Sequence, residues 1–118
     1  MLRNGNTEGY RQSLPGIRQK TLVFGERTLM VESRLEANSV LPEHSHPHEQ
    51  TGYLVAGHIR LRLGGQDHDT RAGDSWCIPP GVPHGALAVA DSVAVEVFSP
   101  VREDYLPKAG EGPGCARV

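Results

Sequence analysis

The sequence predicts an all-β protein, because strand patterns recur along the chain and helical patterns are nearly absent. The clearest alternation of apolar and polar residues lies in residues 58–63, where Ile59, Leu61 and Leu63 share one face. The 14 glycines and 9 prolines among 118 residues indicate many turns. Short strands separated by frequent turns are typical of a β-sandwich or β-barrel.

Eight short strands are predicted along the chain. The first two, 21–24 and 28–31, flank Gly25-Glu26-Arg27 and are expected to form a hairpin. The other predicted strands are 39–46, 52–56, 58–63, 75–78, 83–88 and 92–98. The polar residues 1–15 and the Gly- and Pro-containing residues 107–118 are expected to be flexible arms around a barrel core of about 16–106. The length suits a single domain over residues 1–118.

Charge and hydropathy argue against several classes of partner. A net charge of −2 and a pI of about 6.3 lack the positive excess typical of nucleic-acid or anionic-membrane binding. No stretch approaches 18 apolar residues, and the first residues lack the apolar core of a secretion signal, so we expect a cytoplasmic protein. Cys77 and Cys115 lack metal or redox spacing and are expected to be free thiols, with Cys77 filling the core.

His44-Ser45-His46 is the first indication of chemistry. Within a strand the two imidazoles project to the same face, about 6.5 Å apart, and can bind one metal ion. A solvated strand face also produces this pattern by chance. Further ligands are needed to distinguish the two interpretations.

The surrounding residues resemble the first motif of the cupin superfamily. That motif places two histidines between two glycines, with an acidic residue after the second histidine. His44, His46 and Gly57 match, whereas Gln50 stands in place of Glu and Asn38 in place of the first Gly. Asn tolerates the positive φ of a turn, so Asn38 weakens the match little.

A second segment resembles the second cupin motif. Gly73, Pro79, Gly81 and His84 match it, and Ala88 departs from its terminal Asn. Residues 58–72 between the motifs equal the short spacer typical of compact bacterial cupins. The resemblance implies a β-barrel of the jelly-roll type, also called a double-stranded β-helix. It also implies one divalent ion, for which Zn, Ni, Mn and Fe are the candidates, held by His44, His46, Gln50 and His84.

Gln50 in place of Glu changes the charge of such a site. Three neutral imidazoles and a neutral amide leave the charge of a divalent ion uncompensated, which favours an anionic oxygen ligand. The set also departs from the two-histidine-one-carboxylate ligands of non-haem iron oxygenases. His48, His58 and His68 are interpreted as rim or solvated residues rather than ligands.

The last predicted strand adds a candidate acid–base group. Val93, Val95 and Val97 share one face, so Glu96 and Phe98 lie on the other. If the valines pack against a partner or another sheet, Glu96 lines the pocket and can act as a general base. If the valines fill the core instead, Glu96 faces water.

The residues from Glu96 to Asp104 resemble the C-terminal stretch of the pectin-degradation cupins, which open the ring of unsaturated monouronates. In that group an acid, an aromatic residue and an arginine lie in the pocket, and here they are Glu96, Phe98 and Arg102. Glu96 replaces an Asp, which moves the carboxylate by about one methylene length. Residues 16–20 and 44–50 also resemble that group.

Together these observations predict a metal-dependent enzyme that acts on a small anionic sugar acid. Glu96 and Arg102 are the expected catalytic residues, and Phe98, Lys20 and Arg60 are expected to bind substrate. A small metal-dependent dioxygenase and a non-catalytic ligand-binding or sensor protein are the alternatives. A homodimer is also expected, because the three valines and the apolar N-terminal hairpin offer more β-prone surface than one small barrel can bury.

Overall fold

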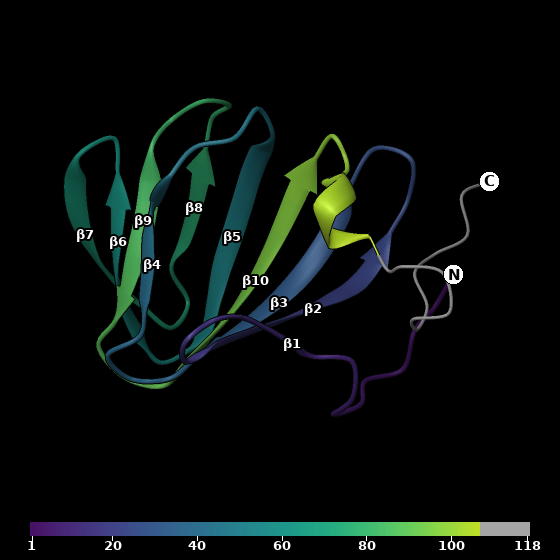
Figure 1. Ribbon diagram of the computed structural model, residues 1–118, viewed down its shortest axis with the longest axis horizontal. Coiled ribbons are helices and arrows are strands. Elements are labelled where there is room, and N and C mark those ends of the chain that lie inside the picture. The colour runs from purple at the N-terminus through teal and green to yellow at the C-terminus, as the bar shows by residue number, and fades with distance from the viewer. Residues whose placement is uncertain (107–118) are drawn as a thin grey trace.

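Two antiparallel β-sheets face each other in the computed structural model, which describes residues 1–106 (Figure 1). The larger sheet has the strand order β1-β2-β3-β10-β5-β8, and the smaller has the order β4-β9-β6-β7. This architecture confirms the predicted all-β jelly roll. In chain order the elements are β1 (Arg11–Leu14), β2 (Ile17–Phe24), β3 (Leu29–Leu35), β4 (Val40–His44), β5 (Glu49–Ala56), β6 (His58–Leu63), β7 (Gln66–Arg71), β8 (Ser75–Ile78), β9 (His84–Ala88), β10 (Ser92–Ser99) and the short 3-10 helix η1 (Glu103–Tyr105).

Two strands lie where none was predicted. Strand β1 falls within the expected N-terminal arm and pairs with β2, so residues 11–14 belong to the sheet. The arm is also attached through Asn6, whose backbone oxygen accepts a hydrogen bond of 3.0 Å from Lys20 Nζ. Strand β7 pairs with β6 at the sheet edge. Only its Thr70 is buried, and without an apolar alternation its sequence gives no strand pattern. The expected C-terminal arm, 107–118, lies outside the described residues.

The predicted strand 39–46 is shorter in the structure. Strand β4 ends at His44, which is the register partner of His84 on β9. His46 lies in the connection to β5, so the two histidines do not share a strand face as predicted. The backbone N–H of Gly81 donates to the His46 carbonyl at 2.9 Å and ties this connection to the loop before β9.

The core lies between the sheets, on alternate residues of each strand. Leu29, Val31 and Leu35 of β3 are buried, and Phe98 of β10 packs with the first two. On β8, Ile78 is buried whereas Cys77 is exposed. The prediction that Cys77 fills the core is therefore wrong, because it lies on the opposite strand face from Ile78.

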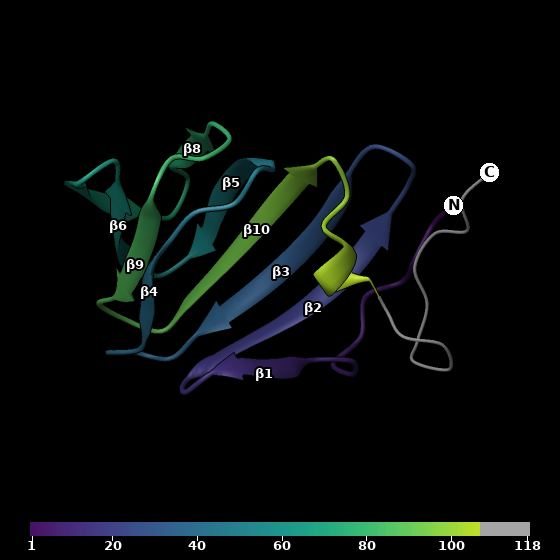
Figure 2. The same ribbon diagram turned by 45° about the horizontal axis from the view of Figure 1, so that its top comes forward.

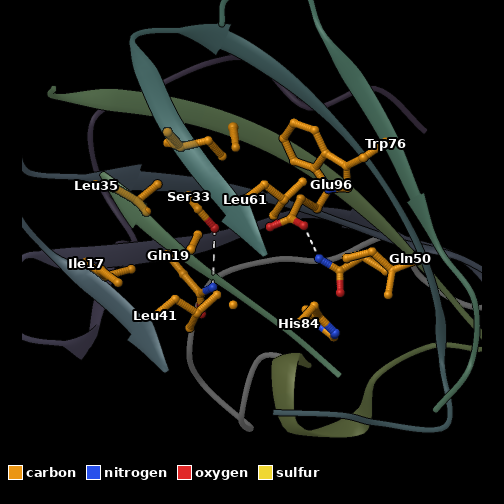
Figure 3. A pocket seen from close by; sticks show the side chains of 15 residues that line it. Ile17, Gln19, Ser33, Leu35, Leu41, Gln50, Leu61, Trp76, His84 and Glu96 are labelled. Atoms are coloured by element: carbon orange, nitrogen blue, oxygen red, sulfur yellow. Dashed lines mark hydrogen bonds between the residues drawn. The ribbon is translucent and has the colours of Figure 1, made fainter. Parts of the chain in front are cut away.

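Strand register places the polar side chains of interest on the inner face of the larger sheet. Across β10, β5 and β8, Glu96 pairs with Gly52, which in turn pairs with Trp76. In the adjacent row Phe98 pairs with Gln50. Figure 3 shows Glu96, Gln50 and Trp76 together at one side of an interior pocket. Among the described residues, no helix has the length and apolar character needed to cross a membrane.

The turn at Gly57 provides a test of this packing. Gly57 has φ +97°, and a Cβ there would lie 2.3 Å from the Asp91 carbonyl oxygen. Gly65 has φ +84° but no atom within 4 Å of its Cβ position. We predict that Gly65→Ala costs about 1–2 kcal/mol from backbone strain, whereas Gly57→Ala costs about 2–5 kcal/mol because overlap adds to it. Urea unfolding measures both, and equal losses would contradict the described packing.

Candidate metal centre and pocket

Three histidines converge from separate segments of the chain. His44 ends β4, His84 begins β9, and His46 lies in the connection between β4 and β5. One ligand nitrogen of each lies within 4.8 Å of the others. The ring centroids of His44 and His84 are 4.3 Å apart, and those of His46 and His84 are 4.8 Å apart. The structure therefore brings together three of the four predicted metal ligands in one cluster.

Each imidazole is oriented by a backbone carbonyl two residues away. Nδ1 lies 2.9 Å from the Pro42 oxygen in His44, 3.0 Å from the His48 oxygen in His46 and 2.9 Å from the Val82 oxygen in His84. A carbonyl only accepts hydrogen bonds, so each Nδ1 carries the proton and donates it. The Nε2 lone pairs are then free for a ligand. His84 Nε2 is buried without a hydrogen-bond partner among the described residues.

Burial keeps two of these rings neutral. Desolvation lowers the pKa of His46 and of His84 below the ordinary value for histidine, and the nearby positive charge of Arg102 lowers both further. A neutral imidazole is the form that binds metal ions. At neutral pH the Nε2 atoms of His46 and His84 thus present lone pairs rather than N–H donors.

Gln50 lies on the inner face of β5 and links the cluster to Glu96. Its side-chain nitrogen donates to a Glu96 carboxylate oxygen, so its Oε1 faces His46 Nε2 at 2.9 Å. With the His46 proton on Nδ1, His46 Nε2 and Gln50 Oε1 both have a free lone pair. The two atoms are close enough to serve as ligands of one cation.

The residues present therefore fit a divalent metal ion. Metal–nitrogen bonds of about 2.1 Å separate two ligands by at most about 4.2 Å, so only small side-chain adjustments are needed. Among the predicted metals, imidazole ligands suit zinc, nickel and iron. We assign His44, His46 and His84, with Gln50 as the fourth donor, as the residues that would hold the ion.

Glu96 lies partly buried on the inner face of β10, beside Gly52 of β5. A Cβ on Gly52 would lie 2.2 Å from the Trp76 ring, so this glycine allows the indole to lie over the sheet beside Glu96. Burial raises the pKa of Glu96 above its ordinary value. The hydrogen bond from Gln50 and the charge of Arg102 act in the opposite direction.

An arginine and two aromatic rings lie next to the histidines. The Arg102 guanidinium lies 4.1 Å from the Tyr105 ring centroid and 5.1 Å from that of Phe98. Phe98 in turn lies 5.8 Å from the His46 ring. Asp104 accepts hydrogen bonds from Nε and Nη2 of Arg102, whose side chain is 14% exposed. The Tyr105 carbonyl accepts a hydrogen bond from Thr21 on β2, which fixes η1 beside the larger sheet (Figure 2).

Two predicted substrate-binding residues lie away from this cluster. Arg60 is exposed on β6, on the opposite face from the buried Ile59 and Leu61. Lys20 lies on the opposite face of β2 from Gln19, and its ammonium group contacts Asn6 and the Tyr10 ring. Neither residue lies in the pocket as expected. Successive residues of a strand face opposite sides of the sheet, and both side chains lie on the outer side.

Several residues that line the pocket were not predicted from the sequence. The cavity volume is about 40 Å³, and its lining includes Gln50, His84 and Glu96 together with Gln19, Ser33 and Trp76. Tyr105 beside Arg102 was also missed. Trp76 lies within the second sequence motif, and Gln19 lies in residues 16–20. The family resemblance of both segments could have indicated these two residues. Ser33 carried none, because its position is visible only from the register of β3.

Comparisons with known proteins agree with this geometry. Residues 31–100 match the family model of the cupin domain. KdgF from Halomonas sp. is 31% identical with a TM-score of 0.80, and the match covers 84% of this chain and 92% of that one. An RmlC-like cupin from Shewanella frigidimarina is 28% identical with a TM-score of 0.84, covering 88% and 94% of the two chains. A salicylate 1,2-dioxygenase variant from Pseudoaminobacter salicylatoxidans, at 17% identity and a TM-score of 0.69 over 75% and 28%, shares the fold. No curated protein gives a significant match.

The metal assignment is tested by removing one buried ligand. We predict that the wild-type protein, loaded with a divalent metal and dialysed, retains one ion per chain and that His84→Ala retains much less. His58→Ala is the matched control, because His58 contacts Asp69 outside the cluster. Elemental analysis measures the content. Full stoichiometric metal in His84→Ala would contradict the assignment.

Proposed function

From the premise that this chain belongs to the cupin family, we propose that it is a metal-dependent enzyme that opens the ring of unsaturated uronates. The observation that carries the proposal is the link from the histidine cluster through Gln50 to the buried carboxylate of Glu96. This arrangement supports a role for Glu96 in proton transfer to a substrate whose anionic oxygen binds at the histidine cluster. The 31% identity to KdgF and the run from Glu96 to Arg102 support the substrate class.

The donor set suits an acidic substrate. Three neutral imidazoles and the Gln50 amide add no negative charge, so a carboxylate or hydroxylate oxygen of the substrate would balance the charge of the ion. When bound, a divalent ion would polarise substrate oxygens as a Lewis acid. The partly buried guanidinium of Arg102, which Asp104 binds from one side, favours the same sign of ligand.

Glu96 is the group proposed to move the proton. In an unsaturated uronate, one ring carbon carries both the hemiacetal hydroxyl and the ring oxygen. The ring oxygen is also part of an enol ether on its other side. Removal of the hydroxyl proton forms the aldehyde and breaks its bond to the ring oxygen, which takes a proton as the enol. Transfer of that enol proton to the alkene carbon gives the ketone, so the reaction is an isomerisation without net gain or loss of atoms. Glu96 accepts and returns the proton in these steps.

Arg102 and Phe98 are proposed to position the substrate. Asp104 accepts hydrogen bonds from Nε and Nη2 of Arg102, whereas Nη1 has no acceptor among the described residues. A substrate carboxylate can bind there, and charge-assisted hydrogen bonds from guanidinium are strong. The edge-on contact between Phe98 and His46 places an apolar ring at the border of the metal site.

The outer face of the larger sheet supports a proposal for the assembly and the compartment. Tyr53 is 50% exposed and Val55 is 49% exposed on β5. Val95 of β10 is the register partner of Tyr53 and is partly exposed beside it. We propose that a second copy covers this face.

Cys77 is a free, exposed thiol on the neighbouring β8. A free thiol at the surface favours the reducing environment of the cytoplasm as the proposed compartment.

Light scattering tests the proposed dimer. At tens of micromolar we predict a mass twice the 12.8 kDa of one chain, because burying the face containing Tyr53 and Val55 is favourable. Val95→Glu should give a monomer by placing a charge at the centre of this face. A monomeric mass for the wild type would rule out the proposed assembly.

The enzymatic role is tested by replacing Glu96 with Gln, which keeps the size but removes the base. We predict that turnover of an unsaturated monouronate falls about 10²-fold or more, while metal content and melting temperature change little. The assay follows the loss of ultraviolet absorbance of the conjugated substrate. Glu49→Gln is the matched control, because Glu49 is exposed on the opposite face of β5 from Gln50.

Other outcomes of that assay favour other functions. Full turnover by Glu96→Gln would exclude the acid–base role of this carboxylate. Binding of uronate without turnover by the wild type would favour a non-catalytic ligand-binding protein. Oxygen uptake with an aromatic or other substrate would instead favour a dioxygenase.

A further inference from the structure

A polar pair lies inside the barrel at a distance from the histidine cluster along the larger sheet. Ser33 is 4% exposed and occupies an inward position of β3 between the buried Val31 and Leu35. Gln19, its register partner on β2, donates a hydrogen bond of 3.3 Å from Nε2 to Ser33 Oγ. Within the described residues, the Ser33 hydroxyl hydrogen has no acceptor. A buried donor without an acceptor costs free energy, which calls for an explanation beyond packing.

The pair faces the same cavity as the proposed reacting groups. Gln19 and Ser33 line one side, and Gln50, Glu96 and His84 line the other (Figure 3). The cavity of about 40 Å³ has room for about three water-sized groups. Ala94, the register partner of Ser33 on β10, is small and leaves this space open. A large substrate does not fit entirely inside, whereas one hydroxyl-bearing carbon does.

We infer that Gln19 and Ser33 form an inner subsite that binds one hydroxyl group of the substrate and thereby selects among hydroxylated sugar acids. The inference rests on the proposed function, because it takes the reacting end of the substrate to lie between Glu96 and the histidines. The Ser33 hydroxyl donates to the substrate oxygen, and the Gln19 carbonyl accepts the substrate hydroxyl proton. These two contacts fix the orientation of the sugar relative to Glu96.

Discrimination between epimers follows from the chemistry of the subsite. A sugar acid whose hydroxyl points into the cavity accepts from the Ser33 hydroxyl, whereas its epimer leaves that buried hydroxyl hydrogen without an acceptor. One such hydrogen bond corresponds to about a tenfold preference. The surrounding Ile17 and Leu41 offer no alternative partner for a misplaced hydroxyl.

The experiment uses the metal-loaded, full-length protein and two unsaturated hexuronates that differ only in the configuration of one ring hydroxyl. We predict that the wild type prefers one epimer by about tenfold in kcat/KM and that Ser33→Ala reduces the ratio to near one. Ser39→Ala is the matched control, since Ser39 is also buried but bonds to the Glu36 carbonyl outside the cavity. The control should keep the wild-type ratio.

A second variant and a binding measurement separate the possible failures. Gln19→Leu combined with Ser33→Ala removes both partners of the pair, so neither one leaves the other unpaired, and the melting temperature checks the loss of the Gln19 contact with Tyr105. Trp76 is the single tryptophan of the chain and lines the cavity, so its fluorescence measures binding of the matching saturated hexuronates without turnover. The double variant should bind both epimers equally.

The outcomes then have distinct meanings. Turnover with an unchanged epimer ratio in both variants, or equal use of the epimers by the wild type, overturns the subsite while leaving the proposed function in place. If the wild type neither binds nor turns over either uronate, the proposed function fails and the subsite inference fails with it.

Discussion

The hydrogen bonds from three imidazole Nδ1 atoms to backbone carbonyls determine what this site can do. Each fixes the tautomer of one ring, so that three Nε2 lone pairs point to a common position. The carbonyls belong to residues two positions away in the chain, so the local backbone path itself orients each ring. Burial then disfavours protonation of His46 and His84. Side chains that would repel one another as cations are thereby kept as neutral ligands.

The sheet register extends this site into the barrel. Gln50 connects His46 to Glu96, and Gly52 makes room for the Trp76 ring beside that carboxylate. The buried carboxylate has a raised pKa, and the positive charge of Arg102 counteracts the effect of burial. A carboxylate with opposing influences on its pKa is suited to accepting and returning a proton.

The sequence predicted the fold well where one strand face is apolar. Strand β6 has its predicted bounds because Ile59 and Leu61 alternate with arginines, whereas β7 was missed because only Thr70 among its residues is buried. Motif spacing located the three histidines, but it did not reveal that β4 ends at His44. Packing between segments distant in the chain decides that boundary.

The limits of prediction at the site have a similar origin. Glu96 was placed correctly on the strand face opposite the valines, because alternation is a local property. Lys20 and Arg60 were expected to bind substrate, but their strand positions turn them away from the cavity. Ser33 and Trp76 depend on register across several strands, which one sequence does not determine.

X-ray absorption spectroscopy of the metal-loaded protein identifies the atoms bound to the ion and so measures the proposed ligand set. We predict three imidazole nitrogens and oxygen donors, one of them from Gln50, with no sulfur. Replacement of Gln50 by Leu should remove one oxygen donor and keep all three imidazoles. A spectrum with fewer than three imidazoles, or with a sulfur ligand, would contradict the convergence of His44, His46 and His84 on one ion.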